Sequence, residues 1–262
     1  MIRSLRAGLL GGVLLLGLAA PVAQAHSPYL LPSVFDASDR KLITVQGAFT
    51  ESFFTPEVVM KSDAYAVIGP DGARTALSPI YLRQLAVFEV ATEAQGTYRI
   101  TTGQRAGRVA KAALVGGEWK FFEGEKAPAN AIDMQSLTTA EVYVTRGAPS
   151  DAALAPIGKG LEFRPITHPS KIVTGRPVVF ETLFDGKPLA GLTVTLSAAD
   201  DRYADDAKAP PETFASDANG RLTVKVGRSG VYQLQARHRV APAGPGLPGQ
   251  SHTYALTFES LR

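Results

Sequence analysis

The chain has 262 residues and no cysteine, and its 27 basic and 24 acidic side chains give a formal net charge of +3 at pH 7. Without cysteine it can form no disulfide, thiolate metal site or cysteine nucleophile, so metal ligands must come from histidine, methionine, carboxylates or the backbone. No basic stripe with interleaved aromatic residues is present, which argues against a nucleic-acid partner. The 25 glycines and 18 prolines are dispersed along the chain, which favours short strands with tight turns over a helical bundle.

The N-terminal segment has the three parts of a cleavable signal peptide. Two arginines precede an apolar run at residues 9–18, and residues 23–25 (Ala-Gln-Ala) form a small-x-small cleavage site. The apolar run is shorter than the roughly 20 residues that a membrane-spanning helix needs. We therefore expect residues 1–25 to be removed during export to the periplasm.

Strand patterns recur at short spacing after this segment, and long helical periodicity is absent. In the first half of the chain they fall at residues 41–49, 64–68, 88–91 and 97–101. The sequence Gly-Pro-Asp-Gly at 69–72 has the composition of a turn. Residues 103–150 show no clear period, so their structure is not predicted.

Residues 147–160 are rich in alanine, proline, glycine and serine, which indicates a linker. Strand patterns then return in close succession, with an Asn-Gly turn, the strongest short hairpin signal, at 219–220. Six or seven short strands in roughly 100 residues are typical of an immunoglobulin-like or prealbumin-like β-sandwich. We predict an all-β protein with two such sandwich domains in tandem, residues 26–146 and residues 161–262.

His26 would become the first residue of the mature protein if cleavage follows residue 25. The α-amine and the imidazole Nδ1 of an N-terminal histidine can close a chelate ring on one metal ion, because the amine has a pKa of only about 8. This position predicts metal binding outside the cytoplasm. The alternative is that cleavage leaves a histidine there by chance.

His238 and His252 each continue the apolar face of a predicted strand near the C-terminus. An antiparallel hairpin across residues 241–250, with Leu234 opposite Leu256, would place the two histidines opposite each other. Their Cβ atoms would then be about 5 Å apart, close enough for two imidazoles to share an ion. A slip of one residue would send one of them to the other face. The alternative is two unrelated histidines at the rim of a sandwich.

These patterns predict that His26, His238 and His252 supply the metal ligands, with the α-amine of His26 as a fourth nitrogen. His168 precedes a proline and is expected in a loop or at a helix cap instead. Such nitrogen ligands suit a divalent nickel, cobalt or copper ion, and a tetragonal set suits copper and nickel best. The affinity is expected to fall as the pH drops through about 6.5, since the ligands must be deprotonated.

A series of short motifs in a fixed order gives the chain a family resemblance. They are His-x-x-Tyr at 26–29, Leu-Pro at 31–32, Gly-Leu-Glu-Phe-Arg-Pro at 160–165, Asp-Gly-Lys-Pro-Leu-Ala-Gly at 185–191, Asp-Ala-Asn-Gly at 217–220 and Gly-Val-Tyr-Gln-Leu-Gln-Ala-Arg-His at 230–238. In this order they resemble the bacterial periplasmic family of unknown function that is labelled a nickel or cobalt uptake component. Tyr29 and His168 stand where many members have tryptophan and asparagine, as in a divergent subgroup. The resemblance implies a periplasmic binding component that works beside an inner-membrane transporter or an outer-membrane receptor.

Three classes of function remain open at this point. The first is a non-enzymatic periplasmic protein that binds a transition metal during its uptake or handling. The second is a non-catalytic adhesion or scaffold module of the cell envelope. The third, and least favoured, is a copper-dependent oxidase with an N-terminal histidine brace, for which no flat aromatic substrate face can be identified. No hydrolase, phosphate-loop, dinucleotide or zinc-protease motif is present, so no catalytic residues are predicted.

Overall fold

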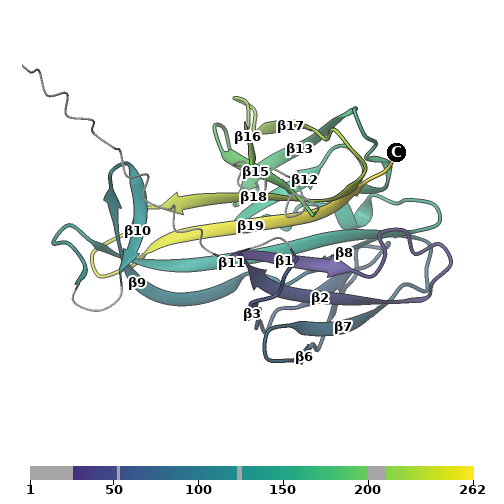
Figure 1. The fold of residues 1–262 in the computed structure, drawn as a ribbon, viewed down its shortest axis with the longest axis horizontal. Helices are drawn as coiled ribbons and strands as arrows, with labels where there is room; N and C mark the ends of the chain where they lie inside the picture. Colours follow the sequence, from purple (N-terminus) through teal and green to yellow (C-terminus); the bar gives the residue numbers. More distant parts are fainter. Residues whose placement is uncertain (1–25, 52–53, 123–125, 200–210) are drawn as a thin grey trace, which may run out of the picture.

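The computed structural model describes residues 26–51, 54–122, 126–199 and 211–262 (Figure 1). The predicted signal peptide, residues 1–25, lies outside the described residues. These residues form β-strands and short 3-10 turns and contain no α-helix, which confirms the all-β prediction. No helix among them is long and apolar enough to cross a membrane.

The described strands form three sheets. In the N-terminal half the strands are β1 (Ser27–Pro32), β2 (Leu42–Thr50), β3 (Val58–Val59), β4 (Ala66–Ile68), β5 (Arg74–Ala76), β6 (Ile80–Tyr81), β7 (Ala86–Ala91), β8 (Gly96–Thr101), β9 (Arg105–Val115), β10 (Glu118–Phe122) and β11 (Ile132–Arg146). In the C-terminal half they are β12 (Leu161–Pro165), β13 (Pro177–Phe184), β14 (Lys187–Pro188), β15 (Thr193–Ala198), β16 (Glu212–Ala215), β17 (Arg221–Lys225), β18 (Gly230–Val240) and β19 (Gly249–Ser260). The 3-10 turns η2 (Ala152–Leu154) and η3 (Pro169–Lys171) lie between β11 and β13.

A ten-stranded sheet, with the order β16-β15-β18-β19-β11-β8-β4-β5, runs through the middle of the molecule, and β9 pairs with β11 while β10 pairs with β9 (Figure 1). A five-stranded sheet of β1, β2, β3, β6 and β7 covers one part of it, and a four-stranded sheet of β12, β13, β14 and β17 covers another. Each pair of layers encloses its own hydrophobic core. The prediction of two sandwiches is confirmed, and the structure adds that they share one sheet.

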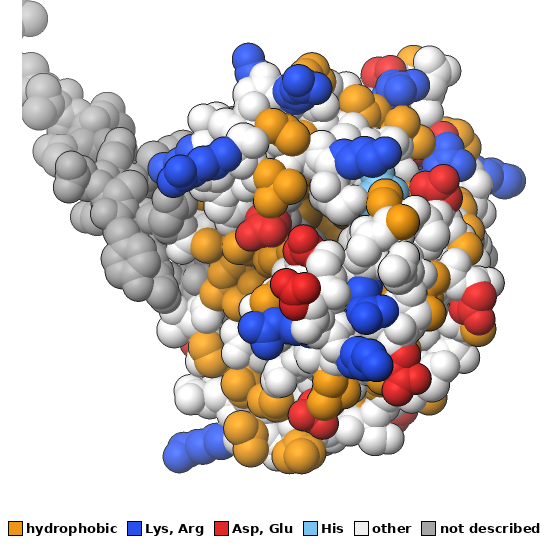
Figure 2. Space-filling view, turned by 90° about the vertical axis from the view of Figure 1, so that its right-hand side faces the viewer, with side chains coloured by type: hydrophobic (Ala, Val, Ile, Leu, Met, Phe, Trp, Pro, Cys, Tyr) orange, Lys and Arg blue, Asp and Glu red, His pale blue; other side chains and the backbone are white. Residues whose placement is uncertain are grey.

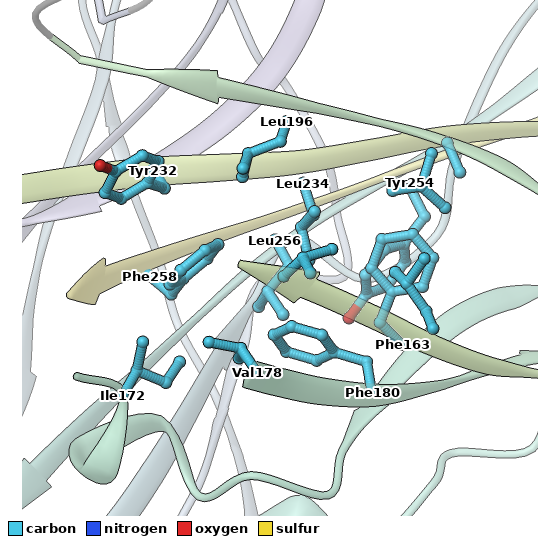
Figure 3. Packing of buried hydrophobic residues seen from close by; sticks show 14 of the residues in the cluster. Phe163, Ile172, Val178, Phe180, Leu196, Tyr232, Leu234, Tyr254, Leu256 and Phe258 are labelled. Carbon is cyan, nitrogen blue, oxygen red and sulfur yellow. The ribbon is translucent and has the colours of Figure 1, made fainter. Parts of the chain in front are cut away.

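The C-terminal core is built from alternate residues of strands on both layers. Large side chains that meet there are Phe163, Phe180, Tyr232, Leu234, Leu256 and Phe258 (Figure 3). The rings of Tyr232 and Phe258 stack with their centroids 5.7 Å apart. The face that shows the C-terminal end of the chain carries side chains of both charges between hydrophobic ones, with no large area of a single sign (Figure 2).

The two sandwiches are joined by a parallel pairing between β11 and β19, along residues 134–142 and 249–257. Parallel neighbours require a long crossover connection, and here the C-terminal strands form that crossover. The segment predicted as a linker, residues 147–160, starts the crossover. Leu154 within it is buried in the C-terminal core, so this segment packs against the domain that follows it.

A buried ion cluster lies at the same junction. Arg99 of β8 lies 2.7 Å (Nε) and 2.6 Å (Nη2) from Oε2 of Glu141 on β11, and its Nη2 lies 3.6 Å from Oε2 of Glu162 on β12. The hydroxyl of Tyr254 donates to Glu141. Glu162 accepts hydrogen bonds from the backbone N–H groups of residues 157 and 158, at 2.9 and 2.8 Å. The cluster therefore ties strands of both sandwiches to residues 157 and 158, near the end of the segment that starts the crossover.

We expect Arg99→Met to lower the free energy of unfolding by about 3–5 kcal/mol, because it leaves buried carboxylates without their cation. Urea denaturation measures this change. Arg164→Met is the matched control, since the pair between Arg164 and Glu181 is partly solvent-exposed and should contribute no more than about 1 kcal/mol. Equal losses in the two variants would contradict the stabilising role of the buried cluster.

Candidate functional site

The structure places His238 directly opposite His252, as the sequence predicts. Strands β18 and β19 pair antiparallel with Leu234 opposite Leu256, and the same register brings the two histidines together. The ring of Phe184 from β13 lies against both imidazoles, with centroid distances of 4.6 Å to His238 and 5.0 Å to His252. The pair is thus packed at the rim of the C-terminal core.

Both ring nitrogens of His252 have side-chain neighbours. Its Nε2 lies 3.0 Å from Oε1 of Gln250, and its Nδ1 lies 3.4 Å from Nε2 of Gln104. In this arrangement the imidazole is neutral, with Nε2–H donating to Gln250 and Nδ1 facing the amide of Gln104. Within the described residues, no histidine or acid joins the pair to make a cluster of three ligands.

Burial also keeps this pair neutral. It lowers the pKa of His238 and His252, and the negative charge of Asp185 only partly opposes the effect. A neutral imidazole can bind a metal ion, but only if the lone pair of its unprotonated nitrogen faces a space that the ion can enter. The hydrogen bonds of His252 occupy both of its nitrogens.

His26 lies on the other side of the ten-stranded sheet. It shares a pocket with Ser251 and Thr253, which flank His252 along β19 and therefore point to the opposite face. On that face the side chain of Gln233 donates to the carbonyl of Pro28 at 2.9 Å and fixes β1 across the sheet. The expected site in which His26 meets His238 and His252 is therefore not formed, because the sheet separates them.

His26 instead meets two carboxylates. Its Nε2 lies 3.2 Å from Oε2 of Glu57 and 3.6 Å from Oε1 of Glu51. The potential ligand atoms of these three residues lie within 4.8 Å of one another. This spacing fits a single cation that is bound by one imidazole and two carboxylates.

The strand pairing explains why these residues converge. Ser27 of β1 is opposite Thr50 of β2 in the last pair of these strands, so His26 and Glu51, the next residue on each strand, lie side by side just beyond it. The chain then turns back, and the backbone N–H of Glu57 donates to the carbonyl of Phe49 at 3.1 Å. Oε1 of Glu57 accepts a hydrogen bond from the backbone N–H of Glu51 at 3.0 Å, which orients its carboxylate.

His168 is a capping residue, as predicted. It precedes η3, and its Nδ1 accepts a hydrogen bond from the backbone N–H of Ser170 at 3.2 Å. Its Nε2 lies 3.1 Å from Oγ1 of Thr97 on β8. These contacts place His168 in the junction between the sandwiches and away from both histidine sites.

The buried histidines predict how stability depends on pH. The folded pKa of His238 and His252 is lowered, so the unfolded chain binds more protons than the folded one as the pH falls. Stability should therefore decline as the pH drops through about 6.5. His238→Gln and His252→Gln should make this decline shallower in urea unfolding between about pH 7 and 5. His26→Gln is the control, and an equally shallow decline in all three variants would contradict the role of the pair.

Comparison with solved structures finds similar proteins. The structure is similar to the D0–D1 domain of intimin, at 9% identity over 88% of this chain and 97% of that chain, with a TM-score of 0.21. It is also similar to a tetra-tandem repeat in the extending region of a large adhesion protein, at 10% identity over 90% of this chain and 50% of that chain, with a TM-score of 0.23. Scores of this size support no functional argument.

The comparison with curated proteins gives no match. A family described as a domain of unknown function, DUF4198, matches residues 23–240. That description names no ion and no transporter, so the nickel or cobalt uptake that the sequence resemblance implies stays a prediction. Because the match covers most of the sequence, the chain belongs to the DUF4198 family of domains of unknown function.

Proposed function

We propose that the protein is an exported, non-enzymatic metal-binding protein whose ligands are His26, Glu51 and Glu57. The observation that supports this most is the convergence of one imidazole and two carboxylates, within 4.8 Å, at the residue expected to begin the mature chain. Compared with the ligands predicted from sequence, this set keeps His26 and exchanges His238 and His252 for two carboxylates. The carboxylates lie on the same face of the sheet as His26, whereas the rings of His238 and His252 pack against Phe184.

The donor atoms suit a divalent transition metal. Two carboxylates balance the charge of a divalent ion, and a mixed nitrogen and oxygen set in tetragonal geometry favours Cu(II) or Ni(II), with Co(II) also accepting imidazole and carboxylate. The side chains of His26, Glu51 and Glu57 are 42%, 57% and 32% exposed. Such a site leaves coordination positions open, which suits an ion that is taken up and passed on better than a permanent structural ion.

In this geometry the imidazole binds through Nε2, the atom that faces both carboxylates. A chelate that includes the α-amine would use Nδ1 instead, so it would require the ring to turn away from Glu57. We propose the Nε2 mode. The site then serves metal uptake or handling in the periplasm, beside the inner-membrane transporter or outer-membrane receptor that the family resemblance implies.

A scaffold or adhesion role is the second candidate. The shared sheet and the buried cluster around Arg99 hold the two sandwiches together as one unit, which suits a spacer that bears load. Such a role needs no ion, so metal binding separates the two candidates.

We expect the mature protein, produced without a tag and beginning at His26, to bind one Ni(II) or Cu(II) ion per chain in calorimetric titrations. His26→Ala and Glu57→Gln should each weaken binding by about tenfold or more, since even the loss of an outer-shell partner has an effect of this size. His238→Gln should bind as the unaltered protein does. A loss in His238→Gln as large as that in Glu57→Gln would contradict the proposed ligands.

One additional alanine before His26 tests the binding mode. It blocks a chelate through the α-amine but leaves Nε2 beside Glu51 and Glu57. No metal–ligand bond of the proposed site is lost, so we expect less than about a threefold change in affinity. A loss as large as that of His26→Ala, measured by the same titration, would mean that the amine and Nδ1 hold the ion.

A further inference from the structure

A pocket of about 430 Å³ lies between the start of β1 and strands β9, β11, β18 and β19 of the ten-stranded sheet. Among the described residues, its lining contains the arginines Arg105, Arg108 and Arg237 and no aspartate or glutamate. The face shown in Figure 2, in contrast, has basic and acidic side chains close together. The pocket therefore concentrates one sign of charge in a concave site.

Arg237 of β18 is one of the cations that line this pocket. Its Nε donates to the hydroxyl of Thr253 at 3.0 Å, and within the described residues no acid lies within ion-pair distance of it. Burial lowers its pKa, and no charged group among the described residues opposes that effect. A partly buried guanidinium without an anion is unfavourable unless a bound anion completes it.

Arg105 of β9 is held in place from two sides. Its Nε donates to the carbonyl of Lys61 at 2.8 Å, and its guanidinium carbon lies 5.5 Å from the centre of the Phe49 ring. These contacts leave the terminal N–H groups for a ligand. The planar fork of a guanidinium matches the paired oxygens of a carboxylate or a phosphate.

Hydroxyl groups on the sheet add further donors. Ser136 of β11 and Ser251 of β19 line the pocket, and their hydroxyls make no hydrogen bond to another described residue. Ser251 as a whole is 3% exposed, but its hydroxyl is not among the buried side-chain atoms that lack a partner, so the hydroxyl opens onto the pocket. A hydroxyl that opens onto a pocket can donate to a ligand there, and an oxyanion between the arginines would accept from both serines.

We propose that this pocket binds a small oxyanion, namely the carboxylate or phosphate group of a small molecule, through Arg237 and Arg105 with help from the hydroxyls of Ser136 and Ser251. The site goes beyond the proposed metal binding, because its ligands and its charge are different. His26 lines the pocket, so the two sites are neighbours, but the anion does not require the ion.

The test uses the mature protein after metal removal on a chelating resin, because EDTA is itself a polycarboxylate. Calorimetric titration with citrate and, separately, with inorganic phosphate should give binding of at least one of them. Arg237→Gln and Arg105→Gln should each weaken this binding by about tenfold or more, the effect of losing hydrogen bonds to a charged group. Arg176→Gln removes an exposed arginine of the loop before β13 and should have no effect.

Binding of citrate alone would identify a carboxylate ligand, and binding of phosphate alone a phosphate ligand. The proposal would be overturned if the unaltered protein bound neither citrate nor phosphate. It would also be overturned if Arg237→Gln and Arg105→Gln both kept full affinity, or if Arg176→Gln lost as much affinity as they do. Glu57→Gln should bind the anion normally, so failure of the metal site and failure of the anion site are distinguishable. Thermal unfolding of each variant verifies that it is folded.

Discussion

The parallel pairing of β11 with β19 is the constraint on which the rest of the structure depends. Ala140, Val142 and Val144 of β11 enter the N-terminal core, whereas Tyr254 and Leu256 of β19 enter the C-terminal core. The sheet that these strands form is therefore a partition between two cores. Successive residues of a strand point to opposite faces, so each polar residue of the central strands belongs to one compartment or the other.

This partition explains which parts of the fold the sequence predicts. The register of β18 and β19 is predictable from sequence because apolar and polar residues alternate in both strands, so that only an in-phase pairing keeps the apolar residues on one face. The loop between them, residues 241–248, is too long to set the register by itself. Strand β11 is different, since most of its last ten residues are buried on both faces and show no alternation. Its partner β19 lies 115 positions further along the chain (249 minus 134), so local patterns carry no information about the pairing.

The same reasoning explains which ligands of the candidate metal site can be predicted from sequence and which cannot. His26 is identifiable from the cleavage motif, but its neighbours depend on the pairing of β1 with β2, and β1 is too continuously buried to show a pattern. Glu51 follows the predicted strand at 41–49, and its position beside Ser27 would be apparent only with that register known. Glu57 depends in addition on a turn that returns to Phe49. Sequence reasoning therefore finds the imidazole and misses both carboxylates.

The arrangement of charge on the two faces accounts for the different roles of the histidines. Burial lowers the pKa of His168, His238 and His252 and keeps their rings neutral within packed surroundings. His26, in contrast, is partly exposed and meets two carboxylates, while Arg105 and Arg237 of the adjacent pocket have no ion pair with either acid among the described residues. If Glu51 and Glu57 served only to neutralise the basic pocket, they would be expected to pair with Arg105 or Arg237. Their orientation toward a single imidazole instead leaves a negative site beside a positive one, an arrangement that suits a cation and an anion bound side by side.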